Sequence, residues 1–244
     1  MNPDAILFLV LLFIVAVLYS SVGHGGASGY LALMGLFHFA PDVMRPTALV
    51  LNLFVSLIAW WQYSRQEILQ KKLFFWLILG SIPATFAGSL ISLDVSLYKQ
   101  LLGVLLLIPA FKMFGFFKSE NQIVNAPRFL PAVIFGIGIG LLSGVIGIGG
   151  GILLSPLLIM LGWSDIRQTA LMSALFIFVN SLTGIGGLAI SGIEFHPELL
   201  VWCILAIAGG LIGSGVGSRK ASSGTLKHIL GVLLIIAGLK LVIF

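Results

Sequence analysis

Long apolar stretches follow one another along almost the whole sequence, with only short charged connections between them. In the first half they lie at about 5–22, 27–40, 46–64, 73–93 and 100–117, and in the second at about 129–146, 150–163, 168–192, 198–217 and 226–244. A helix needs about 20 residues to cross the hydrocarbon of a bilayer. The pattern predicts an all-α polytopic membrane protein, in which the second stretch of each half is a half-span or a tilted helix.

The composition excludes an ordinary water-soluble domain. Hydrophobic residues make up 59% of the chain, charged residues only 9%, and the mean hydropathy is +1.16. Soluble domains carry about 25% charged residues. The pI of about 9.6 does not indicate nucleic acid as a partner, because the basic residues are scattered over connections and form no dense patch. The expected partner is the lipid bilayer.

The stretch 1–20 has no basic leading region and no small-residue cleavage site, so it is interpreted as a retained membrane segment. Cys203 is the single cysteine of the sequence and cannot form an intrachain disulfide.

The two halves of the sequence resemble each other. Three segments match in the same order, at 22–27 and 146–151, at 45–49 and 167–171, and at 102–108 and 230–236. The offset between partners changes only from 122 to 128 residues. Ordered matches of this kind indicate internal duplication. We therefore predict a first membrane repeat at 1–120 and a second at 121–244.

Charge in the connections predicts the orientation of the two repeats. Three connections have a net positive charge, and they contain Arg65, Lys71 and Lys72, then Lys112, Lys118 and Arg128, and finally Arg219, Lys220 and Lys227. Positive connections favour the cytoplasmic side. The connection after the third stretch is positive in the first half but negative in the second, where it holds Glu194 and Glu198. The repeats are therefore expected to be inverted, as in secondary transporters. Both termini are predicted outside a bacterial cytoplasmic (inner) membrane, with Lys240 as an exception to the charge rule.

Two glycine clusters, each just before a short stretch, are the first candidates for a binding site. They contribute Gly23, His24, Gly25 and Gly26 in the first half and Gly147, Gly149, Gly150 and Gly151 in the second. Unwound backbone at membrane depth is tolerated where protein buries it or where it lines a cavity. The helix that follows would direct its N-terminal amides at an anion. The alternative is tight helix packing through small residues, which we favour for isolated glycines such as Gly80 and Gly231.

Polar side chains inside the apolar stretches complete the candidate substrate-binding set. They are Arg45, Thr47, Asn52, Arg167, Thr169, Ser173 and Asn180. Arginine can bind an oxyanion through two parallel hydrogen bonds. For Arg45 and Arg167 we favour the alternative, in which they pair with Asp42 and Asp165. Hydroxyl and amide groups can bind an oxyanion or join helices. His24, an intramembrane ionisable residue, can carry a proton, bind the anion, or simply bond a carbonyl.

An enzyme is not expected, although one alternative stays open. Gly26-Ala27-Ser28-Gly29 fits the Gly-x-Ser-Gly of a rhomboid-type intramembrane protease, but that chemistry needs a histidine base on a neighbouring helix. His38, His196 and His228 lie at the ends of stretches. Metal, phosphate-loop and cysteine motifs are absent from the sequence, so no cofactor is expected.

The stretch from Gly144 to Gly151, with Pro156 and the run from Arg167 to Ser173, resembles the sulfite exporter TauE/SafE family. The resemblance extends over essentially the whole chain. It implies a secondary transporter that moves a small sulfur-containing oxyanion, such as sulfite, sulfoacetate or another organosulfonate, with protons as coupling ions. An anion channel on the same scaffold remains the alternative, and a homodimer is compatible with the sequence. The run after Thr169 departs from the common pattern of small polar residues.

Overall fold

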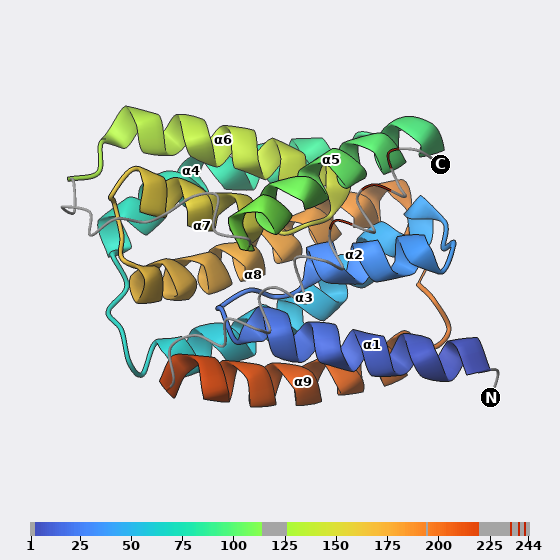
Figure 1. Ribbon diagram of the computed structural model, residues 1–244. Coiled ribbons are helices and arrows are strands. Elements are labelled where there is room, and N and C mark those ends of the chain that lie inside the picture. The colour runs from blue at the N-terminus through green and yellow to red at the C-terminus, as the bar shows by residue number, and fades with distance from the viewer. Residues whose placement is uncertain are drawn as a thin grey trace.

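The computed structural model describes residues 3–113, 126–193 and 195–219, together with Ile235, Leu239 and Val242. In this part the chain forms helices and no strands (Figure 1). The helices are α1 (Pro3–Ser20), α2 (Ala27–Leu36), α3 (Pro41–Tyr63), α4 (Lys71–Ser89), α5 (Val95–Met113), α6 (Phe129–Ile146), α7 (Gly151–Met160), α8 (Ile166–Ser191) and α9 (Leu199–Arg219). The predicted all-α fold is confirmed. Most of the expected stretch 226–244 lies outside the described residues, as do Glu194, Lys220, Lys227 and Lys240.

Five helices, α3, α4, α6, α8 and α9, are long and apolar enough to cross a membrane. Their outward side chains are apolar as well as their buried ones: Leu130 of α6 is 65% exposed and Leu200 of α9 is 74% exposed. A helix that is apolar on all faces needs an apolar environment outside the bundle. Helices α2 and α7 have 10 residues each and are only half as long as a span requires.

Helices α3 and α8 pack against each other in antiparallel directions at the centre of the bundle (Figure 1). Leu49, near the start of α3, lies beside Gly184 in the second half of α8. Tyr63, at the end of α3, packs in one cluster with Ala170 and Leu171, near the start of α8. These two helices carry most of the polar candidates.

Two parallel helix pairs, α4 with α6 and α1 with α9, are each joined through glycines spaced four residues apart. Gly136, Gly140 and Gly144 of α6 approach Leu77, Ser81 and Thr85 of α4. Gly209, Gly213 and Gly217 of α9 approach α1 in the same manner. Such spacing lets backbones come close in a membrane bundle.

The packing role expected of isolated glycines is confirmed at Gly80. A Cβ atom there would overlap the Val133 carbonyl. Gly231 lies outside the described residues.

Candidate functional site

The first glycine segment returns from the C-terminal end of α3 to its middle. The Ser21 carbonyl accepts a hydrogen bond of 2.9 Å from the hydroxyl of Tyr63, the last residue of α3. Six residues further on, the Ala27 N–H donates to Asn52 Oδ1 at 3.0 Å. Helix α2 then continues towards the start of α3. The glycine segment, of which residues 21–23 form a turn, and the half-length helix together follow α3 from its end towards its start.

The second glycine segment takes the opposite path. The Gly144 carbonyl accepts a hydrogen bond of 3.0 Å from Arg45, near the start of α3. The Ile148 carbonyl accepts from Asn52 Nδ2 at 3.3 Å, so the chain has again reached the middle of α3. Helix α7 leads on to the start of α8, which lies near the end of α3. The two short helices therefore start at a common level and run away from it in opposite directions.

Asn52 is the central residue of α3 and joins the two segments. Its amide is fully buried and binds Ala27 on one side and Ile148 on the other, with Ser181 of α8 at 3.4 Å from Nδ2. A Cβ at Gly25 would overlap Oδ1 of this amide, and a Cβ at Gly149 would lie 2.5 Å from Nδ2. These two glycines are thus required by the amide that lies between them.

The N-terminus of each half-length helix is formed by a glycine in the left-handed region. Gly26 precedes α2 with φ 101°, and Gly150 precedes α7 with φ 77°. L side chains rarely adopt such values, so the positions favour glycine. Within the described chain, the N–H groups of Ser28 and Gly29 in α2 and of Gly151 and Ile152 in α7 have no acceptor. Free amides at a helix N-terminus favour an anion.

His24 connects the first segment to the second half of the chain. Its Nδ1 lies 3.0 Å from the Val22 carbonyl, and its Nε2 lies 3.0 Å from the Ser155 hydroxyl of α7. The Ser155 hydroxyl in turn lies 2.8 Å from Ser173 Oγ of α8 and 3.0 Å from the Gly151 carbonyl. Ser155 and Ser173 are buried, while His24 is partly exposed. A continuous row of proton-bearing groups therefore runs from His24 to α8.

Arg45 and Arg167 have different surroundings, although their positions match in the sequence. The buried Arg45 donates to the carbonyls of Ser89, Ile91 and Gly144 at 3.0–3.2 Å and so binds the C-terminal ends of α4 and α6. A cation at a helix C-terminus is stabilised by the last carbonyls and the dipole. The Arg45 Nε is buried without a partner among the described residues.

Arg167 is exposed at the start of α8. The Asp165 carboxylate accepts the Arg167 and Gln168 backbone N–H groups, each at 2.9 Å, and so caps α8. The structure therefore does not bring the two arginines together.

The remaining candidates divide into free and bonded groups. The hydroxyls of Thr47 and Thr169, which occupy matching positions in α3 and α8, are buried and lack partners in the described part of the chain. Asn180 Oδ1 instead accepts from the Thr85 hydroxyl at 2.7 Å, and its Nδ2 donates to the Phe176 carbonyl at 2.9 Å. The hydroxyls of Thr47 and Thr169 thus remain unpartnered in the described chain, whereas Asn180 joins α8 to α4.

Ser28, the nucleophile of the protease alternative, has no histidine partner recorded in the described chain. Its hydroxyl is buried and donates to Tyr19 Oη at 2.9 Å. A serine nucleophile needs a general base within hydrogen-bond reach. The geometry therefore gives that alternative no support.

Two residues of this region were not among the sequence candidates. Ser155 is the only polar side chain of α7, and this isolation within an apolar half-length helix was the available signal. Thr85 lies in α4 and reaches both Asn180 and the Gly140 carbonyl, at 3.0 Å for the latter. No local pattern distinguishes it, because its partners come from α6 and α8.

Comparisons with known proteins agree with this architecture. The family model described as "Sulfite exporter TauE/SafE" matches residues 7–241. A probable membrane transporter protein of Sinorhizobium fredii, y4hK, is 36% identical, with 99% of each chain covered. Probable membrane transporter proteins of Bacillus subtilis (YdhB; 29% identical, 87% of this chain and 89% of the relative) and Methanocaldococcus jannaschii (MJ0441; 28%, 75% and 70%) are also similar. No solved structure matches the chain significantly.

Proposed function

The chain belongs to the sulfite exporter TauE/SafE family of membrane transporters, and from this premise we propose that it carries a small sulfur-containing oxyanion across the bacterial cytoplasmic membrane. Sulfite, sulfoacetate and related organosulfonates are the substrate class. The family name supports the sulfur chemistry, and the free amides beside Asn52 support an anion. The junction of both glycine segments at Asn52 is the single observation that carries the proposal.

The proposal places the anion between the N-termini of α2 and α7. The proposed donors are the free N–H groups of both helices, and the buried, unpartnered hydroxyls of Thr47 and Thr169 lie on the central helices α3 and α8. A buried donor without a partner costs about 1–3 kcal/mol. An oxyanion that accepts these hydrogen bonds removes that cost, and helix dipoles favour its charge.

The two halves act, in this proposal, as inverted repeats at 1–120 and 121–244. The helix contacts support the idea if α1, α3 and α9 of the bundle are taken as equivalent to α6, α8 and α4. The contact of α1 with α9 then corresponds to that of α6 with α4, and the contact of α3 with α9 to that of α8 with α4. The antiparallel α3–α8 pair corresponds to itself. Inverted repeats place transport sites at their interface near the midplane. Both termini would then lie outside, and a homodimer stays a prediction.

The burial of the proposed site supports alternating access. Asn52, Thr47 and Ser173 are fully buried, so an anion reaches them only when helices separate. The Arg45 contacts close the end where α4 and α6 terminate. A hydrogen bond of 2.7 Å from Gln70 to Gln168 closes the end where α8 begins. The proposal requires that one of these two ends opens while the other stays closed.

Protons are the proposed coupling ions, and His24 is the proposed carrier. A carbonyl oxygen only accepts, so His24 Nδ1 holds a proton towards Val22. In neutral His24, Nε2 accepts from the Ser155 hydroxyl. Once Nε2 is protonated it donates to Ser155, and the Ser155 proton turns to Ser173 or the Gly151 carbonyl. Protonation would thus be transmitted to α7 and α8 through one hydroxyl.

Uptake of labelled sulfite and sulfoacetate into proteoliposomes that contain only this protein tests the proposal. The expected result is saturable uptake, exchange against unlabelled anion inside, and a response to an imposed pH gradient. Flux that neither saturates nor exchanges would indicate an anion channel. Absence of flux for both anions, with folded protein, would refute the substrate class.

A further inference from the structure

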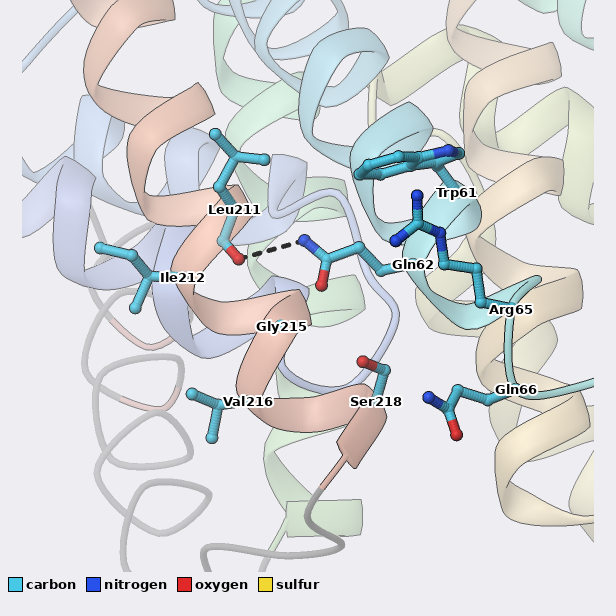
Figure 2. Close-up of a pocket in the computed structure, with 9 residues that line it drawn as sticks. All are labelled: Trp61, Gln62, Arg65, Gln66, Leu211, Ile212, Gly215, Val216 and Ser218. Atoms are coloured by element: carbon cyan, nitrogen blue, oxygen red, sulfur yellow. Dashed lines mark hydrogen bonds between the residues drawn. The ribbon is translucent and has the colours of Figure 1, made fainter.

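A cavity of about 600 Å³ lies between the C-terminal ends of α3 and α9 (Figure 2). It is lined by Trp61, Gln62, Arg65, Gln66, Leu211, Ile212, Gly215, Val216 and Ser218. None of these residues belongs to the glycine segments, and the transport site described above makes no use of them. The cavity therefore needs an explanation of its own.

The wall formed by α3 is polar and carries a fixed cation. The Arg65 guanidinium lies 3.8 Å from the centre of the Trp61 ring, an arrangement that holds the charge in place. Gln62 Nε2 donates to the Leu211 carbonyl at 3.2 Å, and Gln66 follows beside the cavity (Figure 2). None of the described residues that line the cavity is acidic. The polar wall thus suits an anionic group.

The wall formed by α9 is apolar and open to the surroundings. Ile212 is 53% exposed and Val216 55% exposed. The apolar spans end at Tyr63 in α3 and at Ser218 in α9. Arg65 and Gln66 therefore follow the apolar helix α3, whereas Ile212 and Val216 lie within the apolar helix α9. The cavity is apolar on its bilayer side and polar at the boundary, as a phospholipid is.

We propose that this cavity binds an anionic phospholipid, with the phosphate at Arg65 and Gln66 and the acyl chains along Ile212 and Val216. A cation at the end of a membrane span attracts anionic lipids, and Arg65 is the cation that lines this cavity. The lipid would come from the leaflet on the positively charged side of the protein.

Titration of delipidated protein in neutral detergent with phosphatidylglycerol or phosphatidylcholine, followed by native mass spectrometry, tests the proposal. Phosphatidylglycerol should bind more tightly, and Arg65→Ala should weaken it about fivefold. Lys72→Ala is the matched control, because its ammonium lies 5.0 Å from the Trp76 ring at the same end but outside the cavity. It should bind like the wild type.

A second variant fills the cavity without changing charge. Gly215 faces the flexible Gln62 side chain, 3.1 Å from where a Cβ would lie, so Gly215→Leu should fold and lose the bound lipid. Equal affinity for the two lipids, or equal losses in Arg65→Ala and Lys72→Ala, would overturn the proposal. Displacement of the lipid by soluble glycerol phosphate would also overturn it, since the cavity would then hold a free phosphate.

Discussion

The Nε2 atom of His24 lies 3.0 Å from the hydroxyl of Ser155 and so joins the first glycine segment to a helix of the second half. Ser155 is also 2.8 Å from the Ser173 hydroxyl. Any change in the protonation of His24 must alter the hydrogen bond that Ser155 makes. A proton carrier at this place would therefore influence the packing of α7 against α8 directly.

His24→Gln should abolish the response of uptake to a pH gradient. Glutamine keeps hydrogen-bonding groups but cannot carry a proton near neutral pH. Exchange of anion at equal pH on both sides should persist, because the amide donors at α2 and α7 remain. Ser155→Ala should reduce the pH response in the same direction. The measurement is proteoliposome uptake with and without a gradient.

The control for His24 is His38→Asn. His38 is exposed and has a left-handed φ of 62°, which asparagine tolerates. This variant should keep the wild-type pH response. If His24→Gln keeps it as well, His24 is not the carrier.

Gly25→Ala and Gly149→Ala should both impair transport and stability. In each case the new Cβ meets the buried Asn52 amide, and overpacking of this kind costs about 1–3 kcal/mol. Gly138→Ala and Gly186→Ala are matched controls, because a Cβ at these helical positions meets nothing within 4 Å. The controls should be neutral or stabilising by up to about 1 kcal/mol. Thermal unfolding in detergent, with uptake measured in parallel, compares the two variants at Asn52 with the two controls. Equal stability and equal uptake in all four would contradict the close contact of the glycines with Asn52.

Arg45→Ala should destabilise the protein by about 3 kcal/mol or more, because the buried bonds to the Ser89 and Gly144 carbonyls and the part-buried bond to the Ile91 carbonyl lose their charged donor. Arg167→Ala should change stability by less than about 0.5 kcal/mol, because its side chain is exposed. Thermal unfolding of the purified variants checks both values. A stable Arg45→Ala protein that has lost only substrate affinity would instead assign Arg45 to the anion.

Much of the fold follows from hydropathy alone. The stretch predicted at 129–146 coincides with α6, and the two short stretches became α2 and α7. A helix that is apolar on all sides ends where charged residues or glycines interrupt the apolar stretch. The local sequence is therefore enough to predict the helix bounds. The glycine clusters likewise predicted unwound backbone, which five left-handed glycines, Gly23, Gly26, Gly147, Gly149 and Gly150, now supply.

Contacts between distant helices were beyond sequence reasoning. Asp42 is a near neighbour of Arg45 in sequence, yet Arg45 binds carbonyls that are 44–99 residues away. Ser155 became part of the site only because His24, 131 residues earlier, packs against α7. Such contacts depend on how whole helices pack against one another, and this packing cannot be predicted from the local pattern of a single sequence.

Exchange of labelled sulfoacetate and sulfite by Asn52→Asp in proteoliposomes tests whether the anion binds between the two glycine segments. A carboxylate at this position puts a negative charge between the N-termini of α2 and α7, where we place the anion. Its Oδ1 can still accept from Ala27, whereas the donor to the Ile148 carbonyl is lost. Gln100→Glu makes the same change of charge at an exposed position of α5. We predict that Asn52→Asp folds but does not exchange either anion, and that Gln100→Glu exchanges normally. Exchange at the wild-type rate by Asn52→Asp would contradict an anion site between the two glycine segments.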